Sequence, residues 1–360
     1  MATVGAALRR ANVGRIYLAH GTSAGTDPLG LAAAVGRVSP AFRQVIEGVF
    51  KGLVDGILQE RGNYTGRYAA LMERALNAPV ESSEEQSYIE VRRFLWSGEN
   101  HHLGRADAAI RLIDTLDRER LPAGQRVLLI GHSHAGNLFA LLTQLVTGNT
   151  ERVAEFFAAA RVFYRPGGWR TSTLPPWGRV ERLLSEVPRP FATGPLNAVP
   201  LDIVTIGTPV RYGWDMAGCA RLLNFVFHYP HEACERDRAL FPPLWSSLSK
   251  MTNGDFTQQI GIAGTNFMPP VPGSPVWLAD RRLARVLEGP LDPPKAWARW
   301  KCGVRVPDAG ATLLVDYGLR FNLLFKWTGS HTFYTHPEWL LWHLEEIARR
   351  WYNTPGADNE

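Results

Sequence analysis

The chain has 360 residues, of which 45% are hydrophobic and 20% charged, a composition typical of a globular protein with a sizeable core. Lysines and arginines outnumber aspartates and glutamates by 39 to 34. The basic residues are scattered in pairs such as Arg9-Arg10 and form no dense tract, which disfavours a nucleic-acid-binding protein. Three widely spaced cysteines without a C-x-x-C pair argue against a disulfide framework and against a cysteine-based zinc site.

Targeting features are sparse in the sequence. No apolar run reaches the roughly 18 residues that a membrane-spanning helix needs. The segment Met1 to Arg15 lacks the apolar stretch of a cleaved signal peptide. We therefore expect a cytoplasmic protein without a transmembrane segment, while secretion without a cleaved signal and peripheral contact with anionic lipid stay open. The oligomeric state is not predicted.

Short apolar strands alternate with segments of helical period along the chain. This alternation predicts an α/β fold, with a mostly parallel sheet flanked by helices, in a single domain over residues 1–360. The expected strands are 15–19, 88–96, 126–130, 201–206, 259–263 and 312–315. The expected helical regions are 40–76, 106–116, the segment after Gly136, and 337–351.

Three long connections interrupt this alternation, at about 163–200, 217–255 and 269–310. Connections of this length are uncommon in a compact domain unless they are functional. We expect them to be insertions over one edge of the sheet, as lid or cap segments. Many of the 12 tryptophans lie in the second half of the chain, where they form core or line an apolar pocket.

The most informative segment is 126–142, in which an apolar strand leads through the sequence GHSHAG into an amphipathic helix. Small residues at Gly131 and Gly136 allow a strand and a helix to pass closely around one serine with strained backbone torsions. The segment resembles the G-x-S-x-G nucleophile elbow of the α/β-hydrolase superfamily. It departs from that pattern in having Ala135 at the second glycine position. The structural alternative is that Ser133 only caps the helix.

The resemblance implies an α/β-hydrolase fold and a serine nucleophile at Ser133. It also implies an oxyanion hole, formed by one N–H after the first strand and one after the nucleophile. The turn that follows the first expected strand resembles the His-Gly turn of lipases and esterases. Mapped on this chain, the two donors are the backbone groups of Thr22 (or Gly21) and His134.

In the family order, the catalytic histidine follows the last strand. His331 lies in a Gly-Ser-His loop before the closing helix, at the place that the resemblance implies. His336 directly precedes Pro337 and is better explained as the start of that helix, and His343 lies within it. We therefore expect His331 to be the base.

The acid is harder to assign. The family order places it after the strand before the last, and the strand expected at 259–263 leads there to Asn266, which cannot match a carboxylate in stabilising an imidazolium. Asp316 ends the last expected strand, upstream of His331, and is our first choice. The alternatives are Asp215, Asp280 and Asn266.

Two further stretches support the resemblance. Gly207-Thr208-Pro209 follows a strand downstream of the elbow, as in lipase-like hydrolases. A second strand end carries Glu99, Asn100, His101 and His102, where ligands of open α/β sheets gather. These four side chains either line the mouth of the site or are ordinary loop residues.

Two other classes of function match parts of the sequence. The sequence His132-Ser133-His134 superficially resembles the start of the H-x-H-x-D-H metal motif, but Gly136 and Asn137 replace the next ligands, so too few donors remain for zinc. A hydrolase scaffold without catalysis would act as a binding module, and Asn266 at the acid position favours that alternative.

The sequence thus predicts a serine hydrolase that cleaves carboxylic esters, of lipase or esterase type, with Ser133, His331 and Asp316 as catalytic residues. We expect no cofactor and no metal, and a small-molecule or lipid acyl ester as substrate. The aromatic, proline-rich insertions suggest an apolar acyl chain. Acyl transfer to another alcohol stays open as an alternative reaction.

Overall fold

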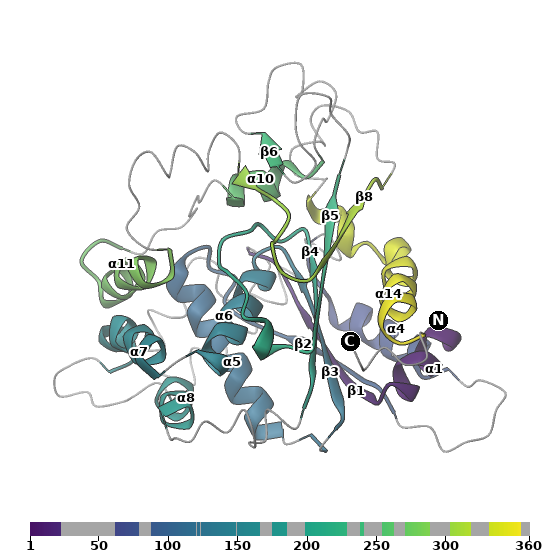
Figure 1. The fold of residues 1–360 in the computed structure, drawn as a ribbon, viewed down its shortest axis with the longest axis horizontal. Helices are drawn as coiled ribbons and strands as arrows, with labels where there is room; N and C mark the ends of the chain where they lie inside the picture. The colour runs from purple at the N-terminus through teal and green to yellow at the C-terminus, as the bar shows by residue number, and fades with distance from the viewer. Residues whose placement is uncertain are drawn as a thin grey trace.

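The computed structural model describes residues 1–22, 62–78, 88–119, 121–122, 124–148, 150–165, 175–185, 199–228, 238–240, 254–262, 271–288, 303–317 and 331–353. Within these ranges a six-stranded sheet is covered by helices on both faces (Figure 1). All strand pairs in this sheet are parallel. The predicted α/β fold, with a parallel sheet flanked by helices, is confirmed.

The strands of the sheet lie in the order β2-β1-β3-β4-β5-β8. Their bounds are β1 Val13–Ala19, β2 Glu90–Phe94, β3 Arg126–His132, β4 Leu201–Ile206, β5 Arg221–Phe227 and β8 Ala311–Val315. Because the strands are parallel, their carboxyl ends share one edge of the sheet, where ligands of open α/β sheets bind. A separate antiparallel pair is formed by β6 (Arg238–Leu240) and β7 (Gly303–Val304).

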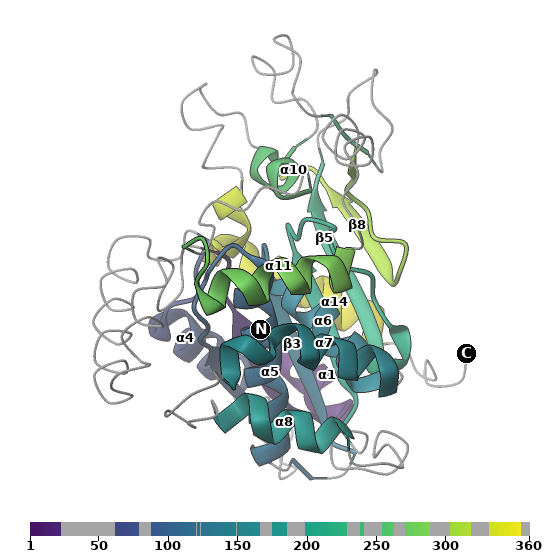
Figure 2. The same ribbon diagram turned by 90° about the vertical axis from the view of Figure 1, so that its left-hand side faces the viewer.

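One face of the sheet carries five helices, which Figure 2 shows from outside. They are α5 His102–Glu119, α6 Ala135–Thr147, α7 Thr150–Tyr164, α8 Pro175–Ser185 and α11 Pro275–Glu288. Trp177, in the first expected insertion, is fully buried and stacks on Tyr164 with ring centroids 5.0 Å apart. This tryptophan therefore belongs to the core.

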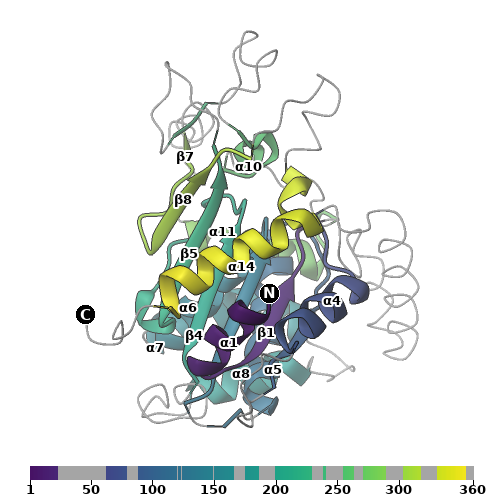
Figure 3. The ribbon, with the colours of Figure 1, turned by 90° about the vertical axis from the view of Figure 1, so that its right-hand side faces the viewer.

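The opposite face is covered by α1 (Ala2–Arg10), α4 (Gly66–Leu76) and α14 (Pro337–Trp351) (Figure 3). The central strands divide their side chains between the two cores, because successive residues of a strand point to opposite faces. In β3, Val127 and Leu129 pack with α5 and α6, whereas Leu128 and Ile130 pack with the α14 side. Burial on both faces explains the uninterrupted apolar run of residues 127–130 in β3.

Three short elements complete the described structure. They are α10 (Phe256–Ile262) and the 3-10 turns η2 (Met216–Gly218) and η3 (Phe333–Thr335). No helix in the described part of the chain is long and apolar enough to cross a membrane.

The sequence located most strands within a few residues, and two assignments were wrong. The strand expected at 259–263 is the helix α10. The strand β5, which lies in the expected insertion 217–255, is instead an inner strand of the sheet between β4 and β8. These two differences decide where the acid of the site is found.

Candidate active site

The turn between β3 and α6 holds Ser133 in a backbone conformation that L-residues rarely adopt, with φ of +56°. The Ser133 N–H donates to the Ile206 carbonyl at 2.9 Å, and the Thr208 hydroxyl donates to the Ser133 carbonyl at 2.7 Å. Strain of this kind costs about 1–3 kcal/mol and persists only where the surroundings enforce it. The turn therefore presents the Ser133 side chain at the carboxyl edge of the sheet.

The glycines of this turn are required by close approach. A Cβ atom on Gly136 would lie 2.2 Å from Thr208 Oγ1, and one on Gly131 would lie 2.5 Å from the Phe139 ring. Ala135 is fully buried, so its methyl group fits where the sequence pattern suggested a glycine. The departure from G-x-S-x-G thus leaves the geometry of the turn intact.

Ser133 and His331, 198 residues apart, are brought together as the sequence predicted. His331 Nε2 lies 2.7 Å from Ser133 Oγ, and His331 Nδ1 lies 2.6 Å from Asp255 Oδ2. All three residues are buried: the exposed fraction is 4% for Ser133, 7% for His331 and 1% for Asp255. The Asp255 contact places the proton on Nδ1, which leaves the Nε2 lone pair to accept the serine hydroxyl. This is the arrangement in which an imidazole can take a proton from serine.

Asp255 has a second role at the start of α10. Its Oδ1 accepts a hydrogen bond from the Gln258 N–H at 2.9 Å, which is how a residue before a helix satisfies an unpaired donor. Gly254 before it has φ of +90°, and a Cβ there would lie 2.1 Å from the Phe227 carbonyl oxygen. Because one carboxylate oxygen is held by the helix, the other has a fixed direction toward His331.

The expected acid, Asp316, makes neither hydrogen bond to the His331 ring; Asp255 takes that place. Asp316 follows β8 and is exposed. The alternatives are engaged elsewhere: Asp215 caps η2 through the Ala217 N–H at 3.1 Å, and Asp280 accepts from the Leu103 N–H at 2.9 Å. Asn266 lies outside the described residues.

The two alternative histidines lie away from the serine, as the sequence reasoning favoured. His336 precedes α14, and its Nδ1 is 2.8 Å from Glu338 Oε1. His343 is buried within α14, where its Nε2 and the Tyr317 hydroxyl are 2.8 Å apart. Burial lowers the pKa of His343 to about 3, so this side chain stays neutral.

The turn that follows β1 packs against Ser133. A Cβ on Gly21 would lie 2.9 Å from Ser133 Cβ, so only glycine fits here. Within the described part of the chain, the Thr22 and His134 N–H groups, both expected in the oxyanion hole, donate no hydrogen bond. The His134 N–H also lies at the start of α6, where the helix dipole favours negative charge.

The polar segment after β2 is buried in contacts with the protein. His101 lies between two carboxylates. Its Nε2 is 3.3 Å from Glu99 Oε1, and its Nδ1 is 3.3 Å from Asp280 Oδ1. Burial alone would lower the pKa of His101, but hydrogen bonds to Asp280 and Glu99 outweigh it and raise the pKa to about 9. His102 Nδ1 lies 2.8 Å from the Tyr212 hydroxyl. These contacts connect the segment after β2 with α11 through Asp280 and with Tyr212 after β4.

The two histidines beside Ser133 remain neutral. Burial, followed by electrostatic interaction with the His331 ring, lowers the pKa of His132 to about 3. Burial and the nearby Arg105 lower the pKa of His134 well below its ordinary value. Among the residues that the structure describes, no group of three or more His, Cys, Asp or Glu side chains is placed to hold a metal ion.

Comparison with protein-family models, with curated proteins and with solved structures finds no match for this chain. The geometry of the site therefore carries the functional argument by itself.

Proposed function

We propose that the protein is a serine hydrolase that cleaves carboxylic esters through an acyl-enzyme on Ser133. One observation carries this proposal. The serine hydroxyl, in its strained turn, lies 2.7 Å from His331 Nε2, and the other nitrogen of that ring lies 2.6 Å from a buried carboxylate. Nucleophile, base and orienting acid in this order are the parts that activate a serine.

The positions of the three groups in the chain support membership of the α/β-hydrolase superfamily. Ser133 follows β3, Asp255 comes after β5, and His331 comes after β8. The order serine, acid, histidine is that of α/β-hydrolases and differs from the order in other serine hydrolase folds.

In the proposed acylation, Ser133 Oγ attacks the acyl carbon of the ester while its proton passes to His331 Nε2. The ester carbonyl becomes an oxyanion, and the His331 imidazolium is stabilised by the Asp255 carboxylate, which keeps its own negative charge. His331 then donates the proton to the leaving alcohol as the carbon–oxygen bond breaks. The product of this stage is an ester on Ser133.

In deacylation, water attacks the acyl-serine and gives its proton to His331 Nε2. Collapse of the second tetrahedral intermediate returns that proton to Ser133 Oγ and releases the carboxylic acid. In both stages we assign oxyanion stabilisation to the Thr22 and His134 N–H groups. One such donor is typically worth about 10²–10³ in kcat.

Replacement of water by another alcohol in the second stage gives the acyltransferase alternative. The other alternative, a scaffold without catalysis, was favoured by the lack of a carboxylate at the expected acid position. Asp255 supplies a carboxylate at 2.6 Å from His331, so that argument no longer favours a non-catalytic scaffold.

Labelling with a fluorophosphonate probe, followed by mass-spectrometric mapping of the modified residue, tests the proposal. We expect one adduct on Ser133 of the wild type and none in Ser133→Ala. A panel of acyl esters of increasing chain length then defines the substrate, and added alcohols separate hydrolysis from acyl transfer. Folded wild-type protein without an adduct on Ser133 would contradict the proposal.

A further inference from the structure

His132 directly precedes the nucleophile and contacts the base from the other side. Its Nε2 lies 2.6 Å from the carbonyl oxygen of His331. The two imidazole rings are 4.7 Å apart between centroids and inclined at 45°. His132 is only 1% exposed, so the contact is shielded from water.

The direction of this hydrogen bond defines the tautomer of His132. A carbonyl oxygen can only accept, so Nε2 carries the proton and Nδ1 carries the lone pair. Nδ1 is buried and has no hydrogen-bond partner. Burial also lowers the pKa of the ring to about 3, which keeps it neutral over the range in which enzymes operate.

We propose that His132 is a positioning residue, whose Nε2–H fixes the backbone of His331 so that the base stays in line with Ser133. This inference rests on the proposed serine hydrolase function and adds a fourth side chain to it. His331 is then held at three points: Nδ1 by Asp255, Nε2 at Ser133, and the main-chain carbonyl by His132.

The segment that carries His331 is helical at His331 and Thr332 and continues into η3, and it has a second attachment that remains when His132 is changed. The Gly62 N–H donates to the Thr332 carbonyl at 3.2 Å and to Thr335 Oγ1 at 2.8 Å. This attachment holds the residues after His331. The Nε2–H of His132 acts on His331 itself, and its loss frees that residue within a segment that is otherwise still anchored.

A neutral imidazole suits the chemistry better than a charged donor at this place. During acylation His331 gains a positive charge, and a second cation with its ring centroid 4.7 Å away would oppose that gain. A neutral N–H donor supplies the hydrogen bond without this repulsion. His132 thus serves the base without taking part in proton transfer.

Two variants separate the hydrogen bond from the packing of the ring. His132→Gln keeps an N–H donor at a similar distance from the backbone, whereas His132→Leu keeps much of the volume and removes the donor. We expect His132→Leu to lower kcat by about 10- to 100-fold, since misplacement of a catalytic group by about 1 Å has effects of that size, with KM changed less than about threefold. His132→Gln is expected to return kcat to within about fivefold of wild type and to keep its pH profile, because His132 does not titrate in that range.

Ile130→Ala is the matched control for stability. Ile130 lies on β3 two residues before His132 and is buried in the same core as Tyr334, which contacts the His132 ring. This change lowers the Tm by creating a cavity, and we expect kcat to stay near the wild-type value below the unfolding transition. If His132→Leu keeps wild-type kcat, if His132→Gln loses as much as His132→Leu, or if Ile130→Ala reproduces the loss, the positioning role is overturned.

Nitrogen-15 NMR of the histidine rings tests the contact without relying on activity. We expect His132 to remain neutral with its proton on Nε2 between pH 5 and 8. A proton on Nδ1, or an imidazolium in this range, overturns the inference. If Ser133 of the wild type takes no fluorophosphonate label, the proposed function fails, and the tautomer still decides whether His132 donates to His331.

Discussion

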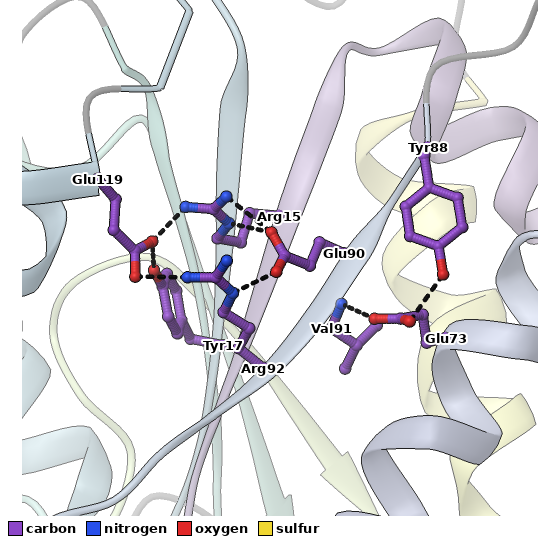
Figure 4. A network of polar contacts seen from close by, with 8 residues as sticks. All are labelled: Arg15, Tyr17, Glu73, Tyr88, Glu90, Val91, Arg92 and Glu119. Atoms are coloured by element: carbon purple, nitrogen blue, oxygen red, sulfur yellow. Dashed lines mark hydrogen bonds and ion pairs between the residues drawn. The ribbon is translucent and has the colours of Figure 1, made fainter.

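The molecule contains two polar clusters, an ion-pair ring on β1, β2 and α5 and the candidate active site around Ser133. Figure 4 shows the first, in which Arg15 and Arg92 alternate with Glu90 and Glu119 in a closed ring of ion pairs. The Tyr17 hydroxyl also donates to Glu119. The second cluster is the candidate active site, formed by Ser133 after β3, Asp255 before α10 and His331.

The clusters differ in charge and in exposure. In the ion-pair ring the side chains are 12–41% exposed, so water screens their attraction and each pair contributes little. The ring also places charge on the edge strand β2, which discourages pairing with other chains. At the site, the groups are more than nine-tenths buried and most imidazoles are neutral.

The degree of burial determines how sensitive each cluster is to small displacements. A partly exposed ring of ion pairs tolerates small displacements, because solvent compensates for lost contacts. A buried site built from fixed hydrogen bonds does not, since each unmade bond costs about 1–3 kcal/mol. The loss of a hydrogen bond at the site should therefore have a larger effect than the loss of an ion pair in the ring, which should act weakly on stability.

The largest difference is expected between two aspartates. Asp255→Asn retains the shape of the side chain but weakens stabilisation of the His331 imidazolium and favours the wrong tautomer, so we expect kcat to fall by about 10⁴-fold. Asp316→Asn should change kcat by less than about twofold. Steady-state kinetics on an ester substrate measure both, and an equal loss in the two variants would contradict the geometry.

The comparison of these aspartates also shows what the sequence could predict. Ser133 and His331 were identifiable as candidate partners because the elbow and the late Gly-Ser-His are local patterns. The acid was missed because residues 259–263 alternate like a strand yet form α10, and this displaced the expected acid position to Asn266. The sequence Gly254-Asp255 with Gln258 three residues later is a helix-start pattern that could have corrected the error. The contact of Asp255 with His331 depends on the packing of β5 and β8, which no local pattern contains.

The next largest effect is expected at His101, which should make the free energy of unfolding depend on pH. Its pKa rises from 6.5 to about 9 on folding, so this group stabilises the fold fully below about pH 6.5, and the contribution is lost as the pH rises through 9. A shift of this size corresponds to on the order of 3 kcal/mol. Urea unfolding measures the free energy of unfolding of the wild type and of His101→Gln from pH 6 to 10. The difference between the two proteins should decrease toward pH 10. A difference in free energy of unfolding that does not change with pH would mean that His101 is not charged in the folded protein.

A smaller effect is expected where the turn after β1 meets the nucleophile. A methyl group on Gly21 would lie 2.9 Å from both Ser133 Cβ and His132 Nδ1. We therefore expect Gly21→Ala to lower kcat about 10- to 100-fold by displacing the oxyanion turn. Gly66→Ala is the matched control, because its new methyl group would meet nothing closer than 3.8 Å and alanine favours the helix α4. Equal kinetics for Gly21→Ala and wild type would place the turn away from the reacting ester.

The smallest effect is expected in the ion-pair ring. Glu119→Gln removes a charge that faces Arg15, Arg92 and the Tyr17 hydroxyl, and it should lower the free energy of unfolding by about 1 kcal/mol, with kcat unchanged. On the exposed surface of α14, Glu346→Gln breaks pairs with Arg349 and Arg350 and should cost less than about 0.5 kcal/mol. High salt should reduce the stability difference between each variant and the wild type, because screening weakens exposed ion pairs. A loss of activity in Glu119→Gln would instead mean that the ion-pair ring is coupled to the active site, and it would contradict the expected difference between the two clusters.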